Sequence, residues 1–228
     1  MKIISWNCNS IKARKEHLLL LLEREDPDVL MLQETRVPLD SFPELPKAYK
    51  IAHSAAIKGR NGAAIITKHD MEIFTTDMEG RFVHVMINEI QFICVYVPNG
   101  GSISSSVEHK MQFFKYLRNF YNIDSMVIGG DFNLLYKTNE FNMEHPYTPP
   151  EQRELMLLEE HLQYTTEDSL YLTWWDYREN KFNRNVGLGI DKIYHSQDLS
   201  ATPIKVLKHY RRLLLPSDHA PIMCEIRK

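Results

Sequence analysis

The sequence predicts an α/β sandwich, because many apolar strand-like runs and few helix-like segments follow one another in mixed order. A strictly alternating order would instead favour a doubly wound sheet. The chain has 228 residues, of which 43% are apolar, so it can bury one sizeable core. No linker composition, low-complexity block or close repeat divides it, and we expect a single catalytic domain over residues 1–228.

The predicted strands are short apolar runs bounded by polar or turn-forming residues, as in IISW at 3–6. These runs lie at 3–6, 29–32, 63–67, 81–87, 92–97, 125–130, 190–195 and 221–226. They supply enough strands for two sheets.

The predicted helices are 12–24, 106–121 and 150–162, where apolar residues recur at roughly helical spacing. The Gly- and Ser-rich stretch at 100–106 predicts a loop in which Ser caps the second helix. Pro149-Pro150-Glu151 marks the start of the third helix, since Pro and acidic residues are favoured in a first helical turn.

Composition excludes several classes of protein. The formal net charge is −3, whereas a protein that holds nucleic acid by bulk charge alone is usually basic, so any such contact must be local. Cys8, Cys94 and Cys224 have no zinc-binding spacing and favour buried free thiols in a reducing compartment. The N-terminus has no long apolar stretch and the run at 18–22 is too short to cross a bilayer, so we expect a cytoplasmic protein without a membrane partner.

Polar side chains stand at the ends of the predicted strands. They are Asn7, Glu34, Tyr96, Asn99, Asp131, Asn133, Asp191, Asp218 and His219. If these ends share one edge of the sandwich, clustered carboxylates need a cation, because neighbouring like charges raise one another's pKa. Oxygen-rich ligand sets suit Mg²⁺ or Mn²⁺. The pattern therefore predicts metal-assisted phosphodiester hydrolysis in which a carboxylate activates water.

Each of these residues taken singly also has a structural interpretation. Glu34 could be a solvated loop acid, residues 131–133 a turn and Asn7 a cap. Tyr96 could belong to the core, and His219 could cap the start of a strand. The series, rather than any one residue, favours a site.

Motifs follow one another in order along the chain. They are SWNCNSIKA at 5–13, LQETR at 32–36, NGAAIITK at 61–68, VYVPNG at 95–100, GGDFN at 129–133, TPPEQRE at 148–154, TWWDYR at 173–178, NVGLGIDKI at 185–193 and SDHAPI at 217–222. Together they resemble exonuclease III and the abasic-site (AP) endonucleases of the endonuclease/exonuclease/phosphatase superfamily, over essentially the whole chain. The resemblance implies a DNase-like, four-layer α/β sandwich in which two mixed sheets lie face to face between helices, with the site at one edge.

The resemblance also implies roles for the polar residues. Glu34 would ligate Mg²⁺ with Asn7 beside it, and Asp218 would serve the metal region. Asp131 would orient or deprotonate the attacking water, while Asn133 would hold Asp131 and the phosphate.

The remaining catalytic roles concern the phosphate itself. Tyr96 would bond the scissile phosphate or assist the leaving group. Asp191 would pair with His219, and this pair would bind a phosphate oxygen.

An apolar pocket for the extruded sugar of an abasic site is implied at Trp174, Leu188 and Ile190. The alternative for Trp174 is an ordinary core aromatic residue. Asn99, Lys12 and Arg36 are expected to contact substrate, although exposed cations are often only solvated surface charges.

Further phosphate contacts are expected from Arg14, Lys15, Lys58 and Arg60. The loop at 134–147 is short for this family, which predicts weaker and more salt-sensitive binding of duplex DNA. That departure leaves open the balance between abasic-site cleavage and 3′ exonuclease action.

The predicted function is therefore a Mg²⁺-dependent DNA repair nuclease, with Mn²⁺ as an alternative ion, that leaves a 3′-hydroxyl. DNA is the expected partner, and nothing in the sequence requires more than a monomer. One alternative is a phosphodiesterase of the same fold that acts on single-stranded DNA or RNA. Another is a nucleic-acid-binding protein without catalytic activity.

Overall fold

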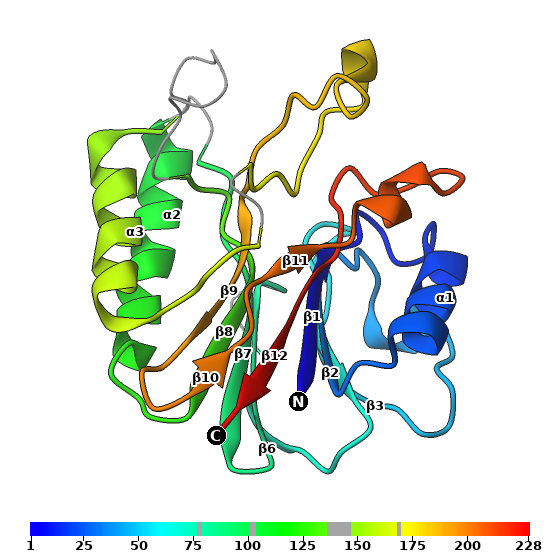
Figure 1. Ribbon diagram of the computed structural model, residues 1–228, viewed down its shortest axis with the longest axis horizontal. Coiled ribbons are helices and arrows are strands. Elements are labelled where there is room, and N and C mark those ends of the chain that lie inside the picture. Colours follow the sequence, from blue (N-terminus) through cyan, green and yellow to red (C-terminus); the bar gives the residue numbers. More distant parts are fainter. Residues whose placement is uncertain (77–78, 101–103, 136–146, 168–169) are drawn as a thin grey trace.

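Two mixed β-sheets pack face to face, and helices cover the outer face of each (Figure 1). The computed structural model describes residues 1–76, 79–100, 104–135, 147–167 and 170–228. The layers are α1, the first sheet, the second sheet, and then α2 with α3. The predicted four-layer α/β sandwich is confirmed.

The first sheet has the strand order β10-β12-β1-β2-β4-β3, and β11 pairs with β12 beside this path. Its strands are β1 (Lys2–Asn7), β2 (Val29–Gln33), β3 (Lys50–Ser54), β4 (Ala63–Thr67), β10 (Ser200–Ala201), β11 (Lys205–Val206) and β12 (Ile222–Arg227). The pair β1 and β2 is parallel, and every other pair in this sheet is antiparallel.

The second sheet has the order β5-β6-β7-β8-β9. Its strands are β5 (Glu72–Thr75), β6 (Phe82–Ile87), β7 (Ile90–Tyr96), β8 (Met126–Asp131) and β9 (Asp191–His195). Only the pair β7 and β8 is parallel.

A helix joins the two strands of each parallel pair. These crossover helices are α1 (Lys15–Glu25) in the first sheet and α2 (Ser104–Leu117) in the second. A crossover of this kind brings the carboxyl ends of both strands to the same edge of a sheet. The polar residues that end β1, β2, β7 and β8 consequently meet at one edge of the sandwich.

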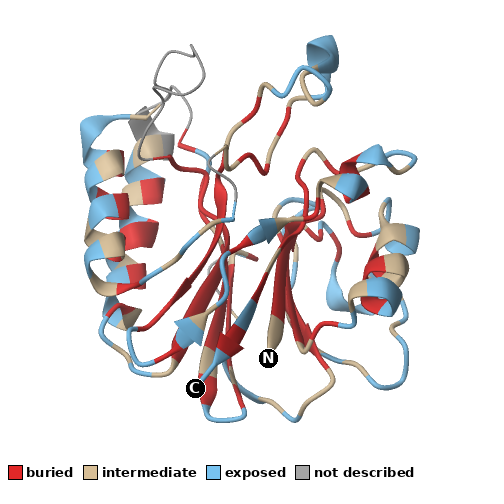
Figure 2. Cartoon of the chain, viewed as in Figure 1, coloured by how far each residue is buried: buried red, intermediate tan, exposed pale blue. Residues whose placement is uncertain are grey.

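Buried apolar side chains fill the space between the sheets, whose central strands are coloured largely as buried (Figure 2). Met31 of β2 and Val85 of β6 belong to this central cluster. A Cβ atom on Gly129 of β8 would lie only 2.7 Å from the Met31 Sδ atom, so glycine lets the sheets approach closely.

The outer layers have their own apolar clusters. Helix α1 packs on the first sheet through Leu18, Leu21 and Leu22. Helices α2 and α3 (Pro149–His161) pack on the second sheet through residues such as Phe113 and Leu155. Short 3₁₀ helices complete the fold: η1 (Leu39–Ser41), η2 (Arg118–Phe120), η3 (Arg178–Asn180) and η4 (Lys208–Arg212).

Every predicted strand overlaps an observed strand, with ends that differ by up to two residues, whereas β3, β5, β10 and β11 were not predicted. The first helix begins at Lys15 rather than at residue 12, because a turn closed by the Arg14 N–H and the Ile11 carbonyl precedes it. The third helix begins at Pro149 as predicted, with a capping box between Thr148 and Glu151.

Two predicted loops fall partly outside the described residues: positions 101–103 of the Ser-rich stretch and 136–146 of the short loop at 134–147. The three cysteines are buried and free, as predicted. No helix in the described part of the chain has both the length and the apolar character needed to cross a membrane.

Candidate active site

A cavity of about 380 Å³ opens at the edge where the strand ends meet. It is lined by Glu34, Tyr96, Asn99, Asp131, Asn133, Tyr147, Trp174, Leu188, Ile190, Asp218 and His219. Each of these residues except Tyr147 was singled out from the sequence. Residues that lie far apart in the sequence are therefore gathered around one space.

Strand register explains how the carboxylates come together. Tyr96, Asp131 and Asp191 are cross-strand neighbours on β7, β8 and β9. Asn7 ends β1 in the other sheet, and its Nδ2 atom donates to Glu34 Oε1 at 3.0 Å and to Asp131 Oδ2 at 2.9 Å. The Asn7 amide thus connects a carboxylate of the first sheet with one of the second.

Asp131 is almost completely buried, with 1% of its surface exposed. The Asn133 backbone N–H donates to the Asp131 Oδ1 atom at 2.9 Å and fixes the orientation of the Asp131 carboxyl group. Burial, reinforced by the charge of Asp191, raises the pKa of Asp131 to about 7. Its protonation state therefore changes near neutral pH.

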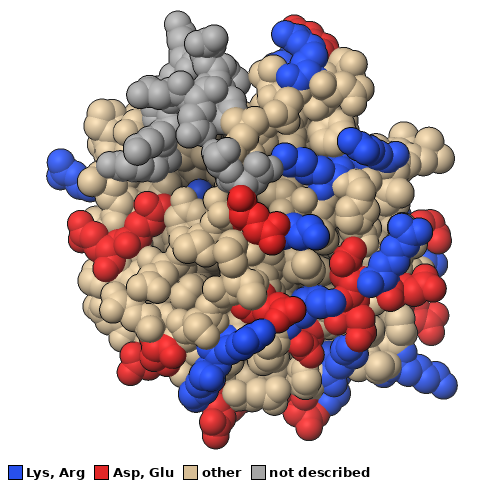
Figure 3. Space-filling model, viewed as in Figure 1, with Lys and Arg blue, Asp and Glu red and all other residues tan. Residues whose placement is uncertain are grey.

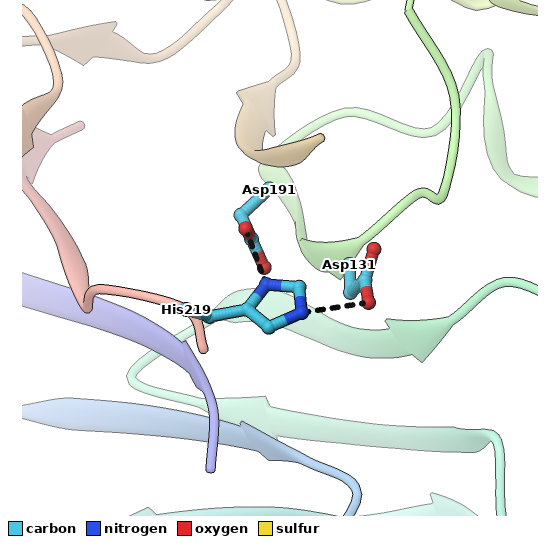
Figure 4. A group of neighbouring side chains, drawn as sticks. All are labelled: Asp131, Asp191 and His219. Atoms are coloured by element: carbon cyan, nitrogen blue, oxygen red, sulfur yellow. Dashed lines mark hydrogen bonds and ion pairs between the residues drawn. The ribbon is translucent and has the colours of Figure 1, made fainter. Parts of the chain in front are cut away.

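His219 lies between two aspartates (Figure 4). Its Nδ1 atom is 2.8 Å from Asp191 Oδ2, and its Nε2 atom is 3.8 Å from Asp131 Oδ2. Thr173 Oγ1 donates to the same Asp191 oxygen at 2.5 Å. Burial alone would lower the pKa of His219, but the charge of Asp191 and the other carboxylates outweighs it and raises the pKa to about 10. At neutral pH the ring is therefore an imidazolium that can attract a phosphate oxygen.

Asp218 faces different partners from those of its neighbour His219. Trp174 Nε1 donates to Asp218 Oδ2 at 3.0 Å, and Asn9 Nδ2 donates to Oδ1 at 2.8 Å. Burial opposes ionisation here, but the charge of His219 and these hydrogen bonds lower the pKa of Asp218. Asp218 is consequently an anion in the same cavity as the imidazolium.

The apolar wall of the cavity contains Trp174, Leu188 and Ile190. Trp174 and Leu188 exchange backbone hydrogen bonds of 2.9 Å in both directions, and Trp174 also forms a bridge with His219. A Cβ atom on Gly189 would lie 2.1 Å from the Tyr171 carbonyl oxygen, so only glycine fits between the two wall residues. Backbone pairing therefore fixes the wall beside His219.

Glu34, Arg36 and Tyr96 form the opposite side of the site. The Arg36 guanidinium bonds Glu34 Oε2, with its Nε atom at 3.0 Å. Burial raises the pKa of Tyr96 well above its ordinary value, so the phenol keeps its proton and can donate it in a hydrogen bond. A second hollow of about 340 Å³ adjoins here, lined by Glu34, Arg36, Gly59, Arg60, Asn61 and Tyr96.

The cationic residues predicted to contact the substrate do not all lie at the cavity. Lys12 is exposed between β1 and α1 and does not line the cavity, and Lys15 and Lys58 are also exposed. Arg14 donates to the Tyr177 hydroxyl at 3.1 Å and to the Pro216 carbonyl at 3.0 Å, so its guanidinium holds two loops together. Arg60 lines the adjoining hollow.

Sequence reasoning missed several residues that support the site, among them Asn9, Thr173, Tyr147 and Lys110. The buried Lys110 Nζ donates to the Asn133 carbonyl at 2.9 Å and to Glu151 Oε1 at 2.8 Å. Nothing in the sequence distinguishes this lysine from an exposed one. Thr173 carried a signal, because it stands directly before Trp174 in a motif.

The donor set fits a metal ion. A carboxylate oxygen of Asp131, one of Asp191 and a ring nitrogen of His219 lie within 4.8 Å of one another, and because His219 is protonated the carboxylates are the ligands that this group offers. Within the described residues, Asp191 Oδ1 is buried without a hydrogen-bond partner. Glu34 and Asp218 add further carboxylate oxygens to the cavity. Such an oxygen-rich set is typical of sites for hard divalent cations.

Comparison with curated proteins shows relatives over the whole chain. The exodeoxyribonuclease III of Haemophilus influenzae is 27% identical over 271 residues, with 100% of both chains covered. The DNA repair nuclease APEX1 of Danio rerio is 29% identical, and the match covers 97% of this chain and 81% of that protein.

Solved structures share the fold over the whole length of this chain. The AP endonuclease from Archaeoglobus fulgidus superposes with a TM-score of 0.91 at 25% identity, with 100% of both chains covered. The 3′ phosphatase NExo from Neisseria, bound to a product DNA hairpin, gives a TM-score of 0.88 at 27% identity, also with 100% of both chains covered.

The profile of the Endonuclease/Exonuclease/phosphatase family matches residues 4–219, a range that includes every residue of the cavity. The resemblance to exonuclease III and the AP endonucleases that the motifs indicated is confirmed, and the chain belongs to the Endonuclease/Exonuclease/phosphatase family.

Proposed function

We propose that the protein is a metal-dependent DNA repair nuclease, which hydrolyses phosphodiester bonds at abasic sites or 3′ ends and leaves a 3′-hydroxyl. One observation carries the proposal: a buried carboxylate, Asp131, lies 3.8 Å from the His219 imidazolium in a cavity that also holds Glu34 and Asp218. This arrangement offers a base for water beside a cation for phosphate.

Asp131 is the proposed general base. A pKa of about 7 suits a group that must accept a proton from water near neutral pH. The Asn133 N–H holds one carboxyl oxygen in place, and the Asn7 amide holds the other. Both hydrogen bonds orient the carboxylate toward a fixed position of the water.

The phosphate is proposed to bind between His219 and Tyr96. The imidazolium pairs with a non-bridging oxygen, and Asp191 keeps the ring oriented through its 2.8 Å hydrogen bond. The protonated phenol of Tyr96 donates to the phosphate or to the leaving oxygen. The added negative charge of the transition state thus meets two donors.

Mg²⁺ is the proposed ion, and Mn²⁺ is a substitute with similar ligand preferences. Glu34 would hold the metal ion, and Asp218 would lie in the same metal region. The ion supplies polarisation of the phosphoryl group and offsets its charge. Asn7 uses its amide nitrogen for two carboxylates and its oxygen for the Asn9 N–H, so it supports Glu34 in this structure, and its direct ligation stays a prediction.

The apolar wall supports an abasic substrate. A sugar without its base can enter a space lined by Trp174, Leu188 and Ile190, whereas an intact nucleotide is larger and costs more to unstack. The names of the relatives, an exodeoxyribonuclease III, an AP endonuclease and a 3′ phosphatase, support DNA ends and abasic sites as substrates.

A panel of labelled oligonucleotides tests the proposal. It contains a duplex with an abasic-site analogue, an undamaged duplex with a recessed 3′ end, the matching single strand and an RNA of the same sequence, each with Mg²⁺, Mn²⁺ or a chelator. We expect metal-dependent cleavage of a duplex and products that a polymerase extends. Asp131→Asn serves as the inactive variant. Asp198→Asn serves as its matched control, since Asp198 lies on the β9–β10 turn, outside the cavity lining, and accepts hydrogen bonds from Ser125 and Ser196.

Two other outcomes of the panel would favour an alternative function. Preference for the single strand or for RNA would favour the phosphodiesterase alternative. Tight binding without hydrolysis in either metal would favour the non-catalytic alternative and refute the proposal.

A further inference from the structure

Two adjacent leucines, three and four positions before Asp218 of the cavity wall, project into solvent. Leu214 is 85% exposed and Leu215 is 73% exposed, the highest values for large apolar side chains among the described residues. They belong to the segment between η4 and β12, which extends from the upper right of the sandwich as an orange-red loop (Figure 1). Apolar side chains in such a position gain nothing from burial within this chain.

Several contacts hold this segment in place, and we call its exposed residues Leu214 and Leu215 the tip. The Pro216 carbonyl accepts hydrogen bonds from the Arg14 guanidinium at 3.0 Å and from the Tyr177 hydroxyl at 2.8 Å. Leu215 has a φ of +49°, a left-handed conformation that is unfavourable for a residue with a side chain. Hydrogen bonds therefore fix the position of the tip, and Leu215 keeps an unfavourable backbone conformation there.

The tip is part of the same short segment as the catalytic groups. Asp218 follows Leu215 by three positions, so their Cα atoms lie within about 11 Å of each other. The Arg211 guanidinium bonds the Ser217 carbonyl between them, and Ser217 Oγ donates to the Asn7 carbonyl at 2.7 Å. The position of the leucines is thus fixed relative to the cavity.

Two accessible cationic side chains lie near the leucines. Arg212 is exposed two residues before Leu214, and with Lys181 it lines a hollow of about 290 Å³ next to Pro216, which also contains Asp176 and the buried Arg211. Blue basic side chains lie beside this projection in the space-filling view (Figure 3). Cations that can meet phosphates, next to apolar groups that can meet bases, match the chemistry of a nucleic-acid strand.

We propose that Leu214 and Leu215 form an apolar wedge that packs against, or inserts between, DNA bases near the cavity. The limit of about 11 Å between Leu215 and Asp218, a residue of the cavity wall, corresponds to about three base steps at the ~3.4 Å spacing of bases along a strand. Apolar side chains used in this way unstack a base step and favour a distorted duplex. The proposal rests on the proposed function only in taking DNA as the ligand.

The test compares Leu214→Ala and Leu215→Gly with the unmodified protein. The glycine variant removes one wedge side chain and also relieves the left-handed conformation, so it should melt at or above the temperature of the wild type. Ile73→Ala is the matched control, because Ile73 is an aliphatic residue 51% exposed on the edge strand β5.

Binding is measured with a chelator present, so that no cleavage occurs. Duplexes carry 2-aminopurine at successive positions around an abasic-site analogue, and affinity is followed by fluorescence anisotropy. We expect the wild type to increase 2-aminopurine emission at one step. Each leucine variant should abolish that increase and weaken binding about three- to tenfold, while Ile73→Ala should match the wild type.

Unchanged affinity and emission in both leucine variants would overturn the wedge. So would a wild-type dimer that the leucine variants convert to monomer in sedimentation, because the tip would then contact a second copy of the chain. Cleavage with Mg²⁺ is scored separately. A wild type that binds the duplex but does not cut it would refute the proposed function, and the chelated binding data would still decide the wedge.

Discussion

Replacing Lys192 by Met should stabilise the protein, and the gain should depend on pH. Lys192 follows Asp191 on β9 and is only 4% exposed. Its Nζ atom lies 4.6 Å from the centre of the Tyr164 ring and 5.5 Å from that of Tyr171. Burial lowers the pKa of Lys192 from 10.5 to about 8, which means that the folded state binds this proton more weakly than the unfolded state.

The size of the effect follows from that difference. At about 1.4 kcal/mol for each pKa unit, a fall from 10.5 to about 8 destabilises the folded state by about 3 kcal/mol wherever the lysine is charged in both states. The penalty is complete below pH 8. It declines as pH rises toward 10.5, because the unfolded chain then holds more protons than the folded one. Contacts with the two rings offset part of it, so we expect a net gain of about 1–3 kcal/mol at pH 7.

Urea unfolding of both proteins from pH 6 to pH 10 measures this gain directly. The difference in unfolding free energy should be largest at or below pH 7 and should shrink steadily above pH 8. Lys205→Met, at an exposed lysine on β11, should show no comparable trend. A gain that does not change with pH, or a loss of stability at pH 7, would refute the reasoning from burial.

Other consequences concern the site. Asp131→Asn should lower turnover by a factor of about 10³, the order typical of a lost general base, while Asp198→Asn keeps full activity in the same cleavage assay. Lys110→Met leaves the Glu151 carboxylate buried without its cation and should cost about 3–5 kcal/mol in urea unfolding, and adding Glu151→Gln should recover part of that loss. Trp174→Ala should reduce cleavage of abasic duplexes more than trimming of undamaged 3′ ends, and equal losses would remove the pocket. A chelator should abolish turnover, and excess Mg²⁺ should restore it; activity that persists in chelator would contradict a metal requirement.

The central strands could be predicted because they are continuous apolar runs buried on both faces. Strand β3 escaped prediction since its sequence, KIAHS, mixes polar and apolar residues at the edge of the first sheet. Strand β5, EIFT, lies at the edge of the second sheet and is mostly exposed. Burial on both faces produces a hydrophobic signal that edge strands do not carry.

The site was predictable to the extent that polar residues end apolar strands. Asn9 and Lys110 act through contacts with distant residues, and no local pattern marks those contacts. Arg14 shows the converse limit: its charge suggested a phosphate contact, whereas its guanidinium bonds Tyr177 and Pro216. Charge type can be read from a sequence, but the partner that uses the charge is set by the fold.

The hydrogen bonds of Asn7 to Glu34 and Asp131 place the reacting groups across the seam between the two sheets. Neither sheet holds all the residues of the proposed site, so the proposed catalysis depends on the alignment of the two sheets. A shift of about 1 Å along that seam would separate the two carboxylates while leaving every strand intact. On heating, turnover should therefore fall at a lower temperature than the far-UV circular dichroism signal does. Turnover then reports the alignment of the two sheets.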